Sequence, residues 1–333
     1  MSARTAQDVK EEIWEEIRAI APEISPEKTH EAGVFLDSFQ DSLPVLTELS
    51  ITPHDSTLGI MVKGAGDDFA ARIREYAGSQ GVGEDALNVF SSIDRKFAGK
   101  HILVKGDFLE GNPFDFTIYW QYLVPVAYMP RLVPNLEMSP QAQEFFTEAS
   151  LLMRTRSAFL GMGFLPPDGV GYNVFFTVPV KKGPGFFSSG FSAMMARIGL
   201  SATLINYFIG FHEYLAPAVK GNFFISLDYG NERPAGVKIY YEIVPLDHTL
   251  EVMRALQIPP QQEERLKSTM EIMGMANLTY LGVRFSPGRM PRLKFYFNRR
   301  FGQKNLDNPE SLADYITSTI WTPPVSYPGA TAS

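Results

Sequence analysis

The sequence predicts an α+β fold in which a ten-stranded antiparallel β-barrel is surrounded by helices. Strand-like runs occur in back-to-back pairs, the pairs recur at a nearly constant interval, and stretches with helical periodicity lie between them. Strands joined in hairpins are antiparallel, and an outer layer of helices would bury the outward face of every strand. The residues leave open one alternative, an open α+β sheet, because alternating strands and helices fit both architectures.

Each strand pair has β-branched and aromatic residues on both sides of a turn containing Gly, Pro, Asn or Asp, which is typical of a hairpin. The pairs begin at residues 45, 101, 157, 222 and 278, at intervals of 56, 56, 65 and 56 residues. The predicted strands are Val45–Thr52 with Ser56–Lys63, His101–Glu110 with Phe114–Tyr122, Ser157–Leu165 with Tyr172–Val178, Asn222–Tyr229 with Val237–Val244, and Leu278–Phe285 with Arg292–Asn298. The five pairs therefore predict ten strands.

Helical periodicity fills the intervals, so the chain is expected to consist of five α-β-β-α repeats. The predicted helical stretches are Thr5–Ile20, Lys28–Leu43, Asp67–Phe97, Ser139–Thr155, Phe187–Ala216, His248–Ala276 and Pro309–Thr319. No linker and no change of composition divides the repeats. We therefore expect residues 1–333 to form one domain.

Composition excludes several classes of protein. With 30 Lys and Arg against 37 Asp and Glu, the formal net charge is −7, which disfavours binding to nucleic acid or to an anionic membrane. The absence of cysteine excludes disulfides, a thiolate nucleophile and Cys-ligated metal. The polar start of the chain is unlike a signal peptide, so we expect a cytoplasmic protein. The uncharged run Ile198–Phe211 has 14 residues, too few to span a membrane, and predicts a buried helix.

Familiar catalytic motifs are missing as well. The chain has no P-loop, no G-x-G-x-x-G after a strand, no G-x-S-x-G and no DDxxD, and its five histidines are scattered without an HExxH motif. These absences give no support to a nucleotide site, a serine hydrolase or a metal centre. Any site for a diphosphate would then depend on Lys, Arg and Tyr rather than on bridging magnesium.

Alternation within the strands predicts which side chains face the barrel interior. In the last strand, Arg292, Lys294 and Tyr296 alternate with apolar residues that would meet the helices. From residue 281 to 304 there are seven Lys and Arg and no acid, which indicates an anion-binding region, although the cations outside the strand are expected to be solvated. The same reasoning gives the full predicted anion site: Lys63, Asn173, Lys238, Tyr240, Arg292, Lys294 and Tyr296. Charge-assisted hydrogen bonds of about 1.5–3 kcal/mol each suit a diphosphate there.

Four segments in this order carry a resemblance to a known family. They are Phe35–Leu43 (FLDSFQDSL), residues 104–108 (VKGDF), residues 224–243 (FISLDYGNERPAGVKIYYEI) and residues 280–297 (YLGVRFSPGRMPRLKFYF). Together they make the sequence resemble the soluble aromatic prenyltransferases of the ABBA, or PT-barrel, family over about residues 5–320. The branch it resembles most comprises the bacterial and fungal enzymes that prenylate phenols.

The resemblance also bears on individual residues. Lys238 stands where the family has a diphosphate-binding arginine, and either Arg292 or Lys294 matches the lysine of the last strand. Tyr296 and Asn173 match a tyrosine and an asparagine of the family's interior.

There are also departures from the family. Phe116 and Gly169 replace basic residues, for which Lys63, more than Lys105, is expected to compensate. Gly59 replaces the aspartate of magnesium-dependent members, which implies an enzyme that needs neither magnesium nor another cofactor.

The activity implied by the resemblance is transfer of a dimethylallyl or longer prenyl group, such as geranyl, from its diphosphate to a small electron-rich aromatic acceptor. Trp120, Phe175 and Phe224 are the expected residues around the carbocation and the acceptor. Glu242 or Asp115 would remove the ring proton, although either could serve only as a structural hydrogen-bond partner. The alternatives are a non-catalytic carrier of a hydrophobic anionic ligand and a scaffold with a filled barrel. A closed barrel has no free edge, so a monomer is expected.

Overall fold

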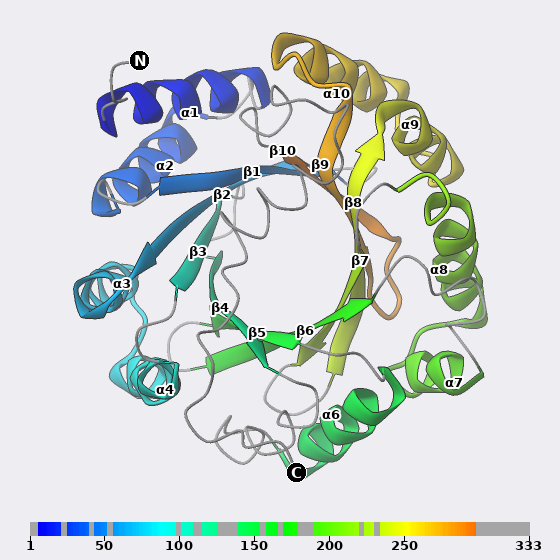
Figure 1. The fold of residues 1–333 in the computed structure, drawn as a ribbon, viewed down its shortest axis with the longest axis horizontal. Helices are drawn as coiled ribbons and strands as arrows, with labels where there is room; N and C mark the ends of the chain where they lie inside the picture. The colour runs from blue at the N-terminus through cyan, green and yellow to red at the C-terminus, as the bar shows by residue number, and fades with distance from the viewer. Residues whose placement is uncertain are drawn as a thin grey trace, which may run out of the picture.

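In a computed structural model of the protein, ten antiparallel strands close into a barrel with helices around its outside (Figure 1). The structure describes residues 6–20, 25–39, 43–51, 56–97, 101–108, 115–124, 139–153, 158–165, 169–178, 189–219, 223–229 and 234–297. The predicted ten-stranded antiparallel barrel is confirmed, and the open-sheet alternative is wrong because the first and last strands pair along residues 47–51 and 293–297.

The strands follow one another around the barrel in chain order, so every neighbouring pair except β1 and β10 is consecutive in the sequence. Their bounds are β1 Leu43–Ile51, β2 Ser56–Ala65, β3 His101–Phe108, β4 Asp115–Val124, β5 Ala158–Leu165, β6 Gly169–Val178, β7 Phe223–Tyr229, β8 Pro234–Pro245, β9 Asn277–Phe285 and β10 Arg292–Phe297. These bounds differ from the predicted ones by no more than three residues.

Helices precede each hairpin and form the outer layer of Figure 1. Their bounds are α1 Ala6–Ile20, α2 Pro26–Ser38, α3 Asp67–Ser79, α4 Glu84–Lys96, α6 Pro140–Met153, α7 Ser189–Arg197, α8 Ala202–Leu215, α9 Leu246–Ala255 and α10 Pro260–Ile272. Leu43 opens β1 rather than closing a helix, because α2 ends at Ser38. The stretch Asp67–Phe97 forms two helices, separated near Gly81, whose φ of +85° suits glycine. The predicted helix Pro309–Thr319 lies outside the described residues.

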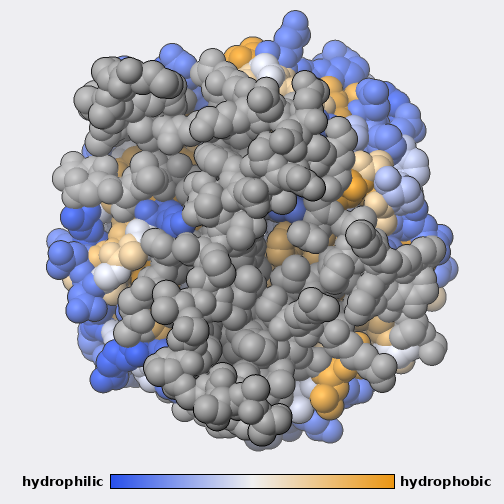
Figure 2. Space-filling model, in the orientation of Figure 1, coloured by the Kyte–Doolittle hydropathy of each residue, from blue (hydrophilic) through white to orange (hydrophobic). Residues whose placement is uncertain are grey.

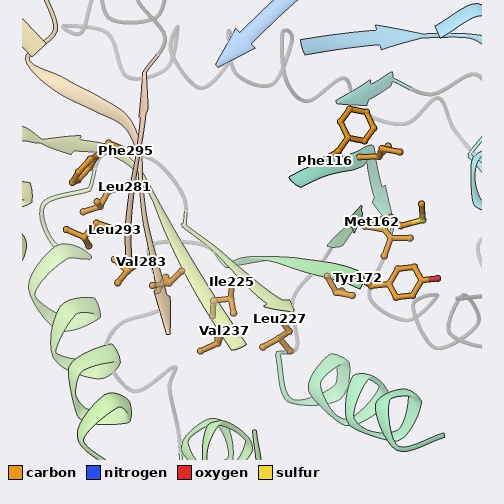
Figure 3. Packing of buried hydrophobic residues seen from close by; sticks show 14 of the residues in the cluster. Phe116, Met162, Tyr172, Ile225, Leu227, Val237, Leu281, Val283, Leu293 and Phe295 are labelled. Atoms are coloured by element: carbon orange, nitrogen blue, oxygen red, sulfur yellow. The ribbon is translucent and has the colours of Figure 1, made fainter. Parts of the chain in front are cut away.

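The hydrophobic core lies between the barrel and the helices. Alternate residues of every strand contribute to it, as Leu293, Phe295 and Phe297 do on β10. In Figure 3, Val237, Ile225 and Leu227 point from their strands toward the helices. Because the apolar residues of each strand lie on this outer face, the intervening residues face the barrel interior.

Hydrophilic residues predominate in the described part of the surface seen in Figure 2. The hydropathy view shows that the described residues at the periphery of one face are mainly hydrophilic, with hydrophobic residues interspersed (Figure 2). Among the described residues, no helix is both long enough and apolar enough to cross a membrane.

Candidate active site

The inner face of the barrel carries most of the side chains that the sequence predicted for the site. Within the described strands, the residues that alternate with the outer core include Lys63 on β2, Asn173 and Phe175 on β6, Phe224 on β7, Lys238, Tyr240 and Glu242 on β8, and Arg292, Lys294 and Tyr296 on β10. All of these are buried except Lys63, Asn173 and Arg292, which are partly buried. Burial lowers the pKa of Lys63.

Trp120 is the exception, and its expected place beside the carbocation is wrong. It is fully buried on the outer face of β4, where its indole N–H donates a hydrogen bond to Asp94 of α4 at 3.0 Å. Its ring stacks on Phe90 with a centroid distance of 6.0 Å. Phe116 and Ile118 share this face, so Thr117 and Tyr119 lie on the inner face of β4.

Asp115 cannot be placed in the same way. It lies at the start of β4, where its backbone pairs with Asp107 of β3, but its side chain lies outside the part of the structure that is described. Its role as a base therefore stays a prediction.

Four charged side chains form what we call the Glu48 cluster: Glu48, Lys105, Asp107 and Lys294. Glu48 lies on β1, and its two carboxylate oxygens contact Lys105 Nζ at 2.6 Å and Lys294 Nζ at 2.5 Å. Lys105 also pairs with Asp107 at 2.8 Å. The cluster therefore holds two cations and two carboxylates, and it is buried away from water.

The electrostatics of the Glu48 cluster follow from this pairing. Burial alone would raise the pKa of Glu48, but Lys105 and Lys294 hold it well below its usual range. Burial would likewise lower the pKa of Lys105, but Asp107 and Glu48 raise it well above its usual range. Lys294 shares its one carboxylate with Lys105, and burial lowers its pKa to about 8. The positive charge of Lys294 is thus balanced by carboxylates less completely than that of Lys105.

A second group, the cation row, consists of Lys238, Arg284 and Arg292. These three residues lie directly opposite one another on β8, β9 and β10. Asp228 of β7 contacts Lys238 at 3.0 Å and Arg284 at 3.2 Å, and Asn173 accepts a hydrogen bond from Lys238 at 3.3 Å. Burial lowers the pKa of Lys238, Asp228 opposes this effect and Arg284 adds to it.

The cation row has unused donors. Arg292 donates to Thr57 at 2.9 Å, but its Nε and the Nε of Arg284 are buried without a hydrogen-bond partner in the described part of the protein. Like charges directly opposite one another on adjacent strands are destabilising, and buried unpaired donors cost free energy. Three cations facing one described carboxylate therefore make a site for an added anion.

Aromatic rings continue around the interior from this row. We call six of them the aromatic belt: Tyr119, Phe175, Tyr240, Tyr296, Tyr280 and Phe224. Successive ring centroids in that order are 5.6, 5.8, 5.9, 6.2 and 6.3 Å apart. Burial raises the pKa of both Tyr240 and Tyr296 well above the usual range, so these phenols stay neutral and keep their protons. The belt offers ring faces of the kind that stabilise an organic cation.

Glu242 lies beside the belt, where it accepts a hydrogen bond from the Tyr280 hydroxyl at 3.2 Å in a buried setting. It is a buried carboxylate on the inner face of β8. Among the described residues, no group of three or more His, Asp or Glu could hold a metal ion.

Sequence reasoning missed several residues of this site: Glu48, Asp107, Tyr119, Asp228, Tyr280 and Arg284. The same alternation would have found some of them. Phe224, Ser226 and Asp228 share the inner face of β7, and Tyr280, Gly282 and Arg284 share that of β9. Lys105, which was expected to matter less than Lys63, is the more deeply buried of the two.

Solved structures share this architecture at low sequence identity. 5-Dimethylallyltryptophan synthase from Streptomyces coelicolor superposes with a TM-score of 0.64 and 13% identity, over 90% of this chain and 98% of that one. 6-Dimethylallyltryptophan synthase from Micromonospora olivasterospora, in complex with DMASPP and Trp, gives 0.61 and 11%, over 90% and 98%. AnaPT from Neosartorya fischeri gives 0.65 and 10%, over 87% and 94%.

These likenesses establish that the chain has the PT-barrel fold of aromatic prenyltransferases. No protein-family model matches the sequence. No curated protein matches it either.

Proposed function

We propose that the protein is an aromatic prenyltransferase that transfers a dimethylallyl or longer prenyl group from its diphosphate to a carbon of an electron-rich aromatic ring. The observation that carries the proposal is the cation row beside the aromatic belt, inside a closed barrel. One group suits a diphosphate and the other suits an allylic cation. The solved structures with this fold include enzymes named for dimethylallyltryptophan, which supports the same class.

The diphosphate would bind along Lys238, Arg284 and Arg292, where the two free Nε–H donors would gain acceptors. The bond between the first carbon of the prenyl group and the diphosphate oxygen then breaks, and both electrons leave on the diphosphate. Cations placed at that oxygen stabilise the charge as it develops. Diphosphate binding also relieves the repulsion within the row, so part of the binding free energy comes from the protein itself.

The allylic cation would be held between tyrosine and phenylalanine rings of the aromatic belt. Ring faces attract a cation through their quadrupole, and a lining without water protects it from hydrolysis. Attack by the acceptor ring forms the new carbon–carbon bond with a pair of its π electrons. Tyr240 and Tyr296 remain neutral through this step because burial raises their pKa.

The ring carbon must finally lose its proton to restore aromaticity. Glu242 is a suitable acceptor, since it is a buried carboxylate beside the aromatic belt and accepts a hydrogen bond from Tyr280. Asp115 remains the second candidate of the sequence analysis. The alternative function, a carrier of a hydrophobic anionic ligand, would use the same cations and rings without breaking the carbon–oxygen bond.

The deciding experiment incubates the purified protein with dimethylallyl and geranyl diphosphates and a panel of hydroxybenzoates, dihydroxynaphthalenes, indole and tryptophan. Parallel samples contain excess EDTA or added magnesium. We expect mass spectrometry to detect a prenyl increment on an acceptor, and to detect it with EDTA present. Product only with magnesium would contradict the expected metal independence. Intact donor in every sample, with donor raising the melting temperature, would replace the enzyme proposal with the carrier.

A further inference from the structure

Small residues lie directly opposite three rings of the aromatic belt. Tyr119 on β4 pairs with Gly161 on β5, Phe175 on β6 with Ser226 on β7, and Tyr240 on β8 with Gly282 on β9. The rings come from even-numbered strands and the small residues from the odd-numbered strand that follows. The pattern therefore recurs along the repeats of the fold, and it places room beside a ring at each of these positions.

Two of the rings occupy that room. A Cβ atom at residue 161 would lie 2.8 Å from Cδ1 and 2.9 Å from Cε1 of Tyr119. A Cβ atom at residue 282 would lie 3.0 Å from the same two atoms of Tyr240. Non-bonded carbons pack at about 3.5–4.0 Å, so the ring edges fill the space that a side chain would need. Glycine is what lets both tyrosines lie against the barrel wall.

A methyl group at either position would have to displace the ring. Movement along the belt is hindered by ring neighbours in the contact range of aromatic pairs: Phe175 lies 5.6 Å from Tyr119 and 5.8 Å from Tyr240, and Tyr296 lies 5.9 Å from Tyr240. The added methyl group would project from the inner face of the neighbouring strand and push the ring away from the barrel wall. The remaining direction is into the barrel, and restoring an ordinary carbon contact requires a shift of about 0.5–1 Å.

We infer that Gly161 and Gly282 determine how long a prenyl chain the barrel accepts, by allowing Tyr119 and Tyr240 to lie back against its wall. The inference rests on the proposed function. Tyr240 follows Lys238 by two residues on the inner face of β8, about 7 Å along the strand. A prenyl tail leaving a diphosphate on the cation row would therefore pass this ring first.

The test measures binding by calorimetry for Gly161→Ala, Gly282→Ala and the control Gly163→Ala. The control adds the same methyl group to the inner face of β5, where its Cβ would meet Thr117 Oγ1 at an ordinary 3.6 Å. The probes are geranyl S-thiolodiphosphate, dimethylallyl S-thiolodiphosphate and inorganic diphosphate. Dividing each thiolodiphosphate affinity by that for inorganic diphosphate removes changes in anion binding and isolates the contribution of the tail.

We expect Gly161→Ala to lower the tail contribution of the geranyl probe by about tenfold or more, and that of the dimethylallyl probe much less. Gly282→Ala should act in the same direction with a smaller change, because its contact is less tight. Gly163→Ala should stay within about twofold of the original protein. Circular dichroism and melting temperature establish that each variant is folded, and two independent variants keep the test valid if one does not fold.

An equal fall for both tails, or the same values in all three variants, would overturn the inference while the proposed function stands. An original protein that binds inorganic diphosphate but gains nothing from either tail would overturn the proposed function, and the inference with it. The two failures are distinguishable, because failure of the proposed function is seen in the original protein, whereas failure of the inference alone is seen only by comparing the variants.

Discussion

The Glu48 cluster and the cation row are neighbouring groups of charged side chains inside the same barrel, yet their charges are balanced differently. In the Glu48 cluster, two lysines face two carboxylates at 2.5–2.8 Å. In the cation row, Asp228 is the described carboxylate beside three cations and contacts two of them, Lys238 at 3.0 Å and Arg284 at 3.2 Å. The first group balances two cations with two carboxylates, whereas the second has cationic donors left over for a ligand.

This difference in charge balance shows that cations inside a barrel do not by themselves make a binding site. Lys105 has two carboxylate partners, and an incoming diphosphate would have to displace them. Arg284 and Arg292 retain unused Nε–H groups, so a diphosphate can gain contacts at these atoms that no described carboxylate holds. A buried pair loses much of its Coulomb attraction to the cost of desolvation, so it is the excess charge that favours a ligand.

The largest effect is expected from breaking the Glu48 cluster. Glu48→Gln leaves two buried lysines short of a carboxylate and should lower the free energy of unfolding by about 3–5 kcal/mol. Chemical denaturation measures this change. The matched control is Glu264→Gln, whose partner Lys267 lies 2.6 Å away in an exposed pair, and which should cost about 1 kcal/mol or less. Equal effects at the two sites would contradict the contrast between buried and exposed pairing.

The cation row should control anion binding. Arg284→Ala and Arg292→Ala should each weaken binding of inorganic diphosphate by about 10- to 100-fold, because each removes a charge-assisted contact. Isothermal calorimetry measures the affinity. Arg289→Ala, in the exposed turn of the same hairpin, removes the same charge and should leave the affinity unchanged.

Removing the charge of Asp228, which contacts the cation row, should change diphosphate affinity in the opposite direction. Asp228 competes with a bound anion for Lys238 and Arg284, so Asp228→Asn should tighten diphosphate binding by several-fold while it destabilises the free protein. Weaker diphosphate binding in this variant would mean that Asp228 positions the cations rather than competes for them.

A smaller effect is expected from pH, through the weakly compensated Lys294. With its pKa lowered to about 8, this lysine loses its charge above that pH, and diphosphate affinity should fall there. The unfolded chain keeps the proton up to the ordinary value of 10.5, so the stability that this group contributes should rise between pH 8 and 10.5. Lys294→Arg, which stays charged, should abolish both trends, and an unchanged pH profile in that variant would contradict the assignment.

The smallest effect on diphosphate affinity is expected from a substitution on the outer face of the barrel. Trp120→Phe removes the hydrogen bond to Asp94 and should cost about 1–3 kcal/mol of stability. Its effect on diphosphate affinity should be negligible, because the ring faces α4. Denaturation and calorimetry on the same sample separate the two results, and a clear loss of affinity without loss of stability would return Trp120 to the site.

Alternation explains both what was predicted about the site and what was missed. It assigns Lys238, Tyr240 and Glu242 to the inner face of β8, where the structure has them. Applied to β4, it places Asp115 and Trp120 on opposite faces, because they are an odd number of positions apart, five, so both could not face the interior. Arg284 lies among the basic residues of the last hairpin, but its role depends on Asp228, which comes from another repeat.

The sequence by itself determined the ten strands and the helices between them. It also determined which residues of each strand share a face, because all of these features depend on the spacing of apolar residues along the chain. Only the tertiary structure decided which charges are paired. Glu48 and Lys294 are separated by 246 residues and meet because β1 closes the barrel against β10. Closure and register across different hairpins determine which side chains meet, and the local periodicity of one strand contains no information about its partner in a distant repeat.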